Sequence, residues 1–209
     1  MNYLKLCQRL RQECGGSGSG PTSVAGQRGE SQNYVDWISQ AWLEIQQERQ
    51  EWRFMWGKES VSLVAGTRLY AKPDGVKSIV PDSVKINGHI ASMVDYEAFR
   101  TRYDADTPSI PRVIAEQPDG QIIISGTPDA AYTLTFEVNK RPQLLVDDDD
   151  IPSIPEEFHM AIVYRAMIDY AGFENAGEVY ARAQKRLSDI MTALADDQLP
   201  PMSFAGPIA

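Results

Sequence analysis

The alternation of hydrophobic and polar positions is most regular between Glu30 and Trp56. Apolar side chains recur there at steps of three and four residues, which places them on one face of an α-helix. The members of this face are Tyr34, Trp37, Ile38, Ala41, Trp42, Ile45, Trp52, Met55 and Trp56. No Pro or Gly interrupts the stretch, so the pattern predicts one helix over residues 30–56, about 40 Å long.

This predicted helix holds all four tryptophans of the chain. We interpret the rings as core residues and expect the helix to form the centre of a helical bundle. The alternative is that the rings face a ligand, but no cofactor motif accompanies them. The last aromatic residues, Trp52 to Trp56, are expected to brace the junction with the segment that follows.

Three further stretches have helical periodicity. The first covers residues 2–13 and ends at Gly15-Gly16, because glycine readily adopts the left-handed conformation at a helix end. The loop 15–20 then matches no phosphate-binding motif and is interpreted as a connector. One further helix is predicted over residues 155–171, with the break at Gly172 or near Asn175-Ala176-Gly177. The last is predicted over residues 178–195, with a buried stripe of Val179, Ala183, Leu187, Ile190, Met191 and Leu194.

The pattern changes to short alternating segments between residues 58 and 142. Asn87-Gly88 is typical of a tight hairpin turn between strands over 79–86 and 89–94. A short helix is predicted over residues 95–103 with Asp95 as its N-cap. A second hairpin follows with strands over 112–116 and 121–125, and 132–138 is the most regular strand of the chain.

These elements predict an α+β fold. We expect an antiparallel helical bundle built from residues 1–57 and 150–197. A small antiparallel β-domain with one short helix, residues 58–149, is inserted into it. Residues 198–209 form an extended C-terminal tail, since they contain three prolines and no charged residue.

Composition narrows the classes of function. The chain has 209 residues and a formal net charge of −9, which disfavours broad attraction to nucleic acid or to anionic membranes. No run of 18 apolar residues and no secretory signal is found, so we expect a soluble protein without a membrane partner. Cys7 and Cys14 are too far apart on one helix for a disulfide, in agreement with a reducing cytoplasm.

Candidate chemistry is sparse. Four consecutive aspartates, Asp147 to Asp150, lie in a stretch interpreted as a solvated linker, with a Ca²⁺ or Mg²⁺ contact as the alternative. Glu156, Glu157 and His159 are the candidates for hydrolysis, but they fall almost consecutively on one turn. His159 also lacks the second histidine of a zinc motif. We therefore expect no catalytic residue, no metal and no cofactor.

Three stretches carry a resemblance to a known family. The segments MNYLKLCQRLRQECG, GESQNYVDWISQAWLEIQ and IPSIPEEFHMAIVYRAMIDYAGFENA together resemble the head–tail adaptor proteins of tailed phages, also called connector or head completion proteins. The resemblance covers nearly the whole chain. It implies a structural virion protein that forms a ring, usually of twelve copies, docked beneath the portal protein.

The resemblance also implies a set of partners. These are the portal protein, neighbouring subunits of the ring, a downstream neck or tail protein, and double-stranded DNA that passes without specific binding. The implied location is the head–tail junction of the virion, after assembly in the cytoplasm of the bacterial host. Partner contacts are expected from the C-terminal residues Pro200, Pro201, Met202, Phe204, Pro207 and Ile208. The alternatives are another neck protein, such as a stopper or terminator, and a phage enzyme.

Overall fold

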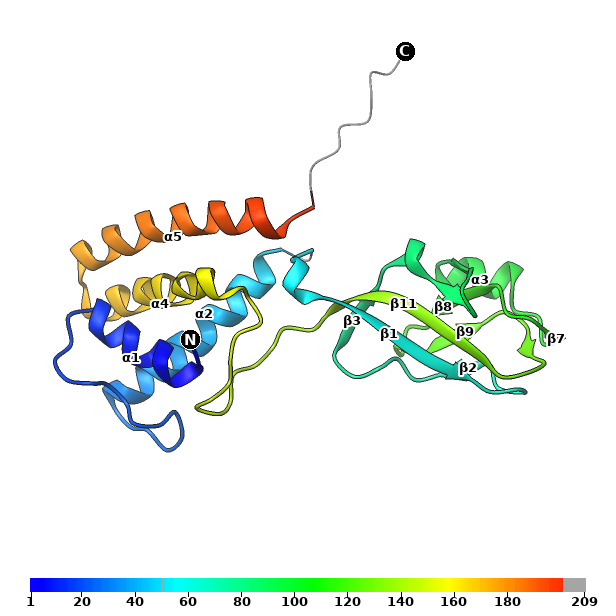
Figure 1. Cartoon of the computed structure of the whole chain (residues 1–209), viewed down its shortest axis with the longest axis horizontal. Coiled ribbons are helices and arrows are strands. Elements are labelled where there is room, and N and C mark those ends of the chain that lie inside the picture. Colours follow the sequence, from blue (N-terminus) through cyan, green and yellow to red (C-terminus); the bar gives the residue numbers. More distant parts are fainter. Residues whose placement is uncertain (50, 201–209) are drawn as a thin grey trace, which may run out of the picture. The chain divides into compact units, whose positions relative to one another are not determined.

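A computed structural model describes residues 1–49 and 51–200, and its backbone divides into two compact units (Figure 1). The helical unit contains Met1–Met55 and the chain from Pro142 onward, and the β-unit contains Trp56–Arg141. The chain thus leaves the helical unit once and returns to it once. Residues 142–149, which the sequence placed in the β-domain, belong to the helical unit.

Five α-helices are found among the described residues, and the predicted mixture of helix and sheet is confirmed. The helices are α1 (Tyr3–Glu13), α2 (Glu30–Glu48), α3 (Tyr96–Arg102), α4 (His159–Glu174) and α5 (Gly177–Gln198). Three single 3₁₀ turns accompany them, η1 (Arg53–Met55), η2 (Pro81–Ser83) and η3 (Glu156–Phe158). No helix in this described part of the chain is both long and apolar enough to cross a bilayer.

Helix α4, and not the aromatic helix α2, is the central helix of the helical unit. It packs extensively against α1, α2 and α5, and Figure 1 shows α4 and α5 side by side. Buried residues lie on several sides of α4, and many are small, including Ala161, Ala166 and Ala171. Small side chains let neighbouring helices approach closely, which a helix lined with tryptophan does not allow. The prediction that the aromatic helix occupies the centre is therefore wrong.

The predicted helix over residues 30–56 is also too long, because α2 ends at Glu48. Arg49 has an extended backbone, with φ −133° and ψ 143°. The indole N–H of Trp52 donates to the carbonyl of Ile45 at 2.9 Å. Trp52 also stacks on Phe54 at a centroid distance of 5.6 Å. Burial of this indole and its hydrogen bond to a carbonyl near the helix end favour the end of α2 at Glu48, which no Pro or Gly signals.

The last two helices are separated by a left-handed residue. Asn175 has φ 53°, and the N–H of Ala176 donates to the carbonyl of Ala171 at 2.9 Å, so of the two predicted breaks the helix ends at the one near Asn175 and not at Gly172. The predicted stripe of α5 is buried only in part. Ala183 and Leu194 are fully buried, whereas its other members are half-buried, because α5 packs mainly against α4.

The β-unit contains eleven short strands among its described residues. They are β1 (Trp56–Leu63), β2 (Leu69–Tyr70), β3 (Val76–Ile79), β4 (Lys85–Ile86), β5 (His89–Ile90), β6 (Ser92–Met93), β7 (Pro108–Ser109), β8 (Val113–Glu116), β9 (Ile122–Ile124), β10 (Thr127–Pro128) and β11 (Tyr132–Lys140). One sheet runs β1-β11-β4-β5, with β3 also on β11, and another runs β2-β9-β8-β6. The first and last strands pair antiparallel from Trp56 opposite Asn139 to Leu63 opposite Tyr132.

Two short strand pairs are parallel, which the sequence did not predict. They are β6 with β8 and β7 with β10. Parallel neighbours need a crossover connection, and α3 lies in the crossover from β6 to β8. The predicted cap is confirmed, since the Asp95 side chain accepts from the N–H of Ala98 at 2.9 Å.

The predicted turn at Asn87-Gly88 is also confirmed. Both residues have positive φ, 47° and 81°, as the tight turn between β4 and β5 requires. The Asn87 side chain accepts a hydrogen bond from the N–H of Thr133 at 2.7 Å, which ties the hairpin to β11. The core beside these strands is mainly aliphatic, with Ile114, Ile124 and Leu134 at its centre.

Candidate functional site

The predicted C-terminal contact residues fall at the limit of what the structure describes. Pro200 is exposed, whereas Pro201, Met202, Phe204, Pro207 and Ile208 lie outside the described residues. The end of α5 is fixed from within the helical unit, because the guanidinium of Arg53 donates to the carbonyl of Asp197 at 3.1 Å. The contact role of the tail stays a prediction.

The three residues considered for hydrolysis do not meet at one point. His159 is buried with 2% of its surface exposed, whereas Glu156 and Glu157 are both exposed. Its ring Nε2 donates to the carbonyl of Ile154 at 3.1 Å, and its Nδ1 contacts the amine of Met1. Burial, followed by the charge of that amine, lowers the pKa of His159. The geometry therefore gives the imidazole a structural role in fixing the start of α4.

The two cysteines are buried or half-buried free thiols. Burial raises the pKa of Cys7 and of Cys14 to about 12. A thiol with so high a pKa is a poor nucleophile and a poor metal ligand at neutral pH.

The acidic run Asp147–Asp150 is a rigid structural element and not a freely solvated linker. Asp148 Oδ1 accepts hydrogen bonds from the N–H of Val24 at 2.5 Å and the hydroxyl of Ser23 at 3.2 Å. The backbone carbonyls of Asp148 and Asp150 accept from the first residues of α1 at 3.2 and 2.8 Å. This run thus holds the start of α1 and the loop before α2 in place.

The side chain of Asp150 is hydrogen-bonded to the backbone of its own segment. Its Oδ2 accepts from the backbone N–H groups of Val146 at 2.6 Å and Asp147 at 2.9 Å, and these donors hold the pKa of Asp150 below its usual range. No group of three or more His, Cys, Asp or Glu side chains within residues 1–49 and 51–200 is arranged to hold a metal ion. The carboxylates of Asp148 and Asp150 are already used by backbone donors.

The same linker exposes an unusual amount of apolar surface. Leu144, Val146 and Ile151 have 65%, 67% and 61% of their surface accessible, although hydrogen bonds hold the segment rigid. Asp147 and Asp149 lie among them and are also exposed. We call these five residues the acidic linker surface. Ordered and exposed aliphatic side chains of this kind mark contact surfaces.

A second charged surface, which we call the arginine cluster, was not among the sequence-based predictions. Arg9, Arg182 and Arg186 converge from α1 and α5 on one residue, Glu13. Arg9 and Arg186 approach its oxygens at 2.6 and 3.3 Å, and Arg182 donates to its backbone carbonyl at 2.5 Å. The four-residue spacings from Arg9 to Glu13 and from Arg182 to Arg186 can be read from the sequence. The meeting of α1 with α5 cannot.

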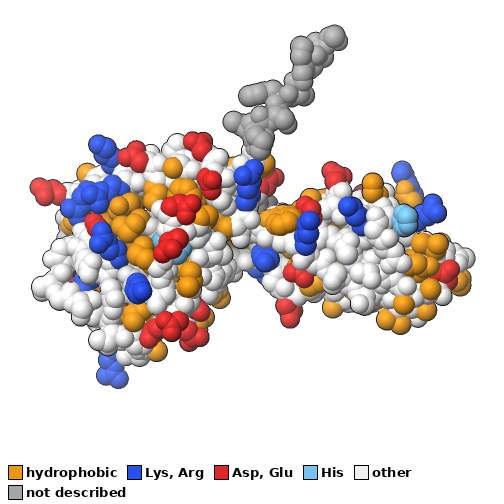
Figure 2. Space-filling model, viewed as in Figure 1, with side chains coloured by type: hydrophobic (Ala, Val, Ile, Leu, Met, Phe, Trp, Pro, Cys, Tyr) orange, Lys and Arg blue, Asp and Glu red, His pale blue; other side chains and the backbone are white. Residues whose placement is uncertain are grey.

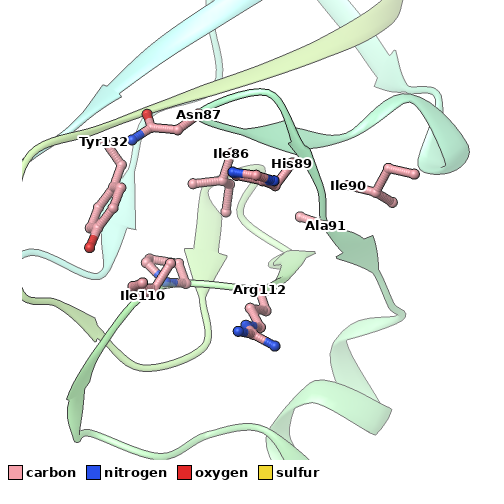
Figure 3. Close-up of a pocket in the computed structure, with 9 residues that line it drawn as sticks. Ile86, Asn87, His89, Ile90, Ala91, Ile110, Arg112 and Tyr132 are labelled. Atoms are coloured by element: carbon pink, nitrogen blue, oxygen red, sulfur yellow. The ribbon is translucent and has the colours of Figure 1, made fainter.

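The β-unit has a shallow pocket of about 600 Å³ (Figure 3). Its floor is apolar and includes the buried Ile86 and Ala91, and its rim includes the exposed His89 and Arg112. Figure 3 shows Tyr132 and Arg112 at different edges, with Ile110 between them in this view. The Tyr132 hydroxyl donates to Asp129, which raises the pKa of this tyrosine. The pocket offers an open apolar surface with a polar rim.

A family model described as SU10 adaptor protein matches residues 1–205. No curated protein matches the chain closely enough to count as a relative. The match covers both units, so it applies to the helices and to the inserted sheet alike.

Proposed function

Because the chain belongs to the SU10 adaptor protein family, a family of phage head–tail adaptors, we propose that it forms a ring at the head–tail junction. The protein is a structural component of the phage particle. In our proposal the ring, of twelve copies, docks beneath the portal protein and joins the DNA-filled capsid to the tail. The family match over residues 1–205 carries this proposal.

Features of the helical unit support a role in assembly. Its largest aromatic side chains, including Trp42 and Trp52, are almost fully buried within one copy. A subunit that satisfies its own core can still offer unlike surfaces to its neighbours, as a cyclic ring requires. The acidic linker surface and the arginine cluster are two such surfaces.

The charge of the chain agrees with passage of DNA without binding. The formal net charge is −9 per copy, and attachment to phosphates requires an excess of Lys and Arg. We propose that the channel of the ring is acidic or neutral and that duplex DNA passes through it. A downstream neck or tail protein is the expected partner on the other side of the ring.

The decisive experiment measures the mass of the purified chain alone and after mixing with its portal protein. The expected result is a complex of one portal ring with a ring of this chain, visible by electron cryo-microscopy. A chain that binds no portal and forms no ring in any mixture would contradict the proposal.

A truncated chain without residues 200–209 tests the role of the tail. We expect it to fold, with the helical circular dichroism of the full chain, and to lose attachment to the neck proteins. If the truncated and full chains attach equally well, the tail has no role in attachment. The proposed ring would not be contradicted by that result.

A further inference from the structure

The helical unit has two charged surfaces of opposite sign that are only partly neutralised within one copy. In the arginine cluster the guanidinium groups of Arg9 and Arg186 share the carboxylate of Glu13, whose side chain is only 15% exposed, and Arg182 donates to the backbone carbonyl of the same residue. Arg9 and Arg186 keep 46% and 47% of their side chains accessible. The cluster therefore presents an excess of positive charge to its surroundings in a chain of net negative charge.

The acidic linker surface presents the opposite charge. Asp149 has one hydrogen bond, from the side-chain amide of Asn2 at 3.0 Å, and the described residues place no Lys or Arg in an ion pair with Asp147 or Asp149. Figure 2 shows a group of Lys and Arg side chains on one part of the helical unit, with acidic side chains beside it, and a separate group of Asp and Glu side chains at its lower edge in this view.

The acidic linker surface is ordered before any partner arrives. Besides the hydrogen bonds to Asp150, the Gln143 side chain donates to the carbonyl of Ile151 at 2.9 Å and accepts from the N–H of Ser153 at 2.8 Å. A surface that is already fixed loses little conformational entropy on binding.

The arginine cluster also has an apolar component that suits the exposed aliphatic side chains of the linker. The guanidinium of Arg186 lies over the ring of Tyr164 at 5.5 Å from its centroid. Paired charges around an apolar centre are the usual composition of a specific protein contact.

We propose that the arginine cluster of one copy binds the acidic linker surface of a second copy. This inference rests on the proposed ring and names its lateral contact. The two surfaces belong to the same unit and differ from each other, so the contact is heterologous, and its repetition closes a ring when the rotation allows it. Complementary charge then fixes which faces meet.

DNA is a poorer partner for the arginine cluster. A carboxylate at the centre of the cluster repels a phosphate, and exposed Leu144, Val146 and Ile151 have no counterpart on a nucleic acid backbone. The second copy supplies both the carboxylates and the apolar side chains that the cluster can accept.

The test uses charge reversal in the full chain. One variant carries Arg182→Glu and Arg186→Glu, a second carries Asp147→Lys and Asp149→Lys, and a third carries all four changes. Each two-residue variant places like charges at every contact and should weaken self-association by about 100-fold or more. The four-residue variant restores opposite charges and should assemble again.

A matched control reverses two exposed arginines of the β-unit, Arg100→Glu and Arg102→Glu, and should assemble like the unaltered chain. Masses are measured by analytical ultracentrifugation over a range of protein and salt concentrations, and folding is checked by circular dichroism. A mixture of the two defective variants has opposite charges at both of its alternating contacts and should assemble into a ring in which the two variants alternate.

The outcomes separate this contact from the proposed function. If the unaltered chain and all variants form rings equally well, the proposed contact between the two surfaces is wrong, whereas the proposed ring is supported. If the unaltered chain stays monomeric both alone and with the portal protein, the ring fails and the contact fails with it. Salt-sensitive binding of duplex DNA that the Arg182→Glu, Arg186→Glu variant loses, without any change in self-association, would also overturn the contact.

Discussion

The helical unit and the β-unit are held together by different kinds of interaction. Aromatic rings fill much of the helical core, and hydrogen bonds from side chains join segments distant in sequence, as between Gln46 and Gln143. The β-unit has a mainly aliphatic core, and backbone ladders together with turn conformations define its pairing. Single side chains should therefore matter most in the helical unit, and backbone conformation should matter most in the β-unit.

The largest effect is expected from Trp52→Ala. The ring is 1% exposed, stacks on Phe54 and donates to Ile45, so its loss leaves a cavity and an unpaired carbonyl. The free energy of unfolding should fall by about 3–5 kcal/mol. Urea unfolding followed by circular dichroism measures it. The control is Trp56→Ala, in a ring that is 44% exposed, with a loss of about 1 kcal/mol or less. Equal losses would contradict the separate roles of the two rings.

A smaller effect is expected from Gln46→Ala. The buried amide donates to the carbonyl of Gln143 at 3.0 Å and accepts from its N–H at 2.7 Å. Its removal leaves backbone groups of the returning chain unpaired, at a cost of about 2 kcal/mol in unfolding free energy. Gln47→Ala, at the neighbouring exposed position, should change stability by about 0.5 kcal/mol or less. The same urea titration compares the two variants.

Acidic pH should destabilise the helical unit through His159. Its pKa is lowered in the folded state from an ordinary value of 6.5, so the unfolded chain binds more protons in acid. The contribution of the neutral His159 imidazole to the free energy of unfolding is fully present above about pH 6.5. This contribution is lost as the pH falls below that value. Thermal unfolding of the unaltered chain and of His159→Gln across this range measures the effect, and the variant should lose this part of the pH dependence. The control His89→Gln, at an exposed position in the β-unit, should retain it.

Two glycine substitutions should shift stability in opposite directions. Gly88 has φ 81° in the hairpin turn, where alanine is strained, and Gly88→Ala should cost about 1 kcal/mol. Gly172 lies within α4 with no neighbour within 4 Å of an added Cβ, so Gly172→Ala should stabilise by about 0.5–1 kcal/mol. Melting temperatures of both variants are compared with the unaltered chain. A loss of stability in both would contradict this assignment of backbone effects.

Local signals in the sequence predicted much of the fold. Asp95 acts as the predicted N-cap, and Asn87-Gly88 forms its turn, because each effect depends on residues close in sequence. The end of α2 escaped prediction, since the contact of Trp52 with Ile45 exists only in the folded core. The central place of α4 also depends on how three helices pack around it.

The surfaces were harder to predict than the core. The four aspartates were noticed as a charged run, but their hydrogen bonds to Val24 and to the start of α1 depend on the folded arrangement. The arginine cluster requires the meeting of α1 with α5, at opposite ends of the sequence. The family resemblance rests on short sequence stretches whose residues form the packed core. Those stretches do not indicate which surface residues meet in the folded chain.

The pairing of β1 with β11 has a consequence for the order of folding. Contacts between α2 and α4 span the entire β-unit in sequence, and closing a flexible loop of that length costs about 4 kcal/mol of chain entropy. Once Trp56 lies opposite Asn139, the ends of that loop are already together. Pairing of β1 with β11 bears that cost itself, so the helices should assemble in a later step that no longer carries it.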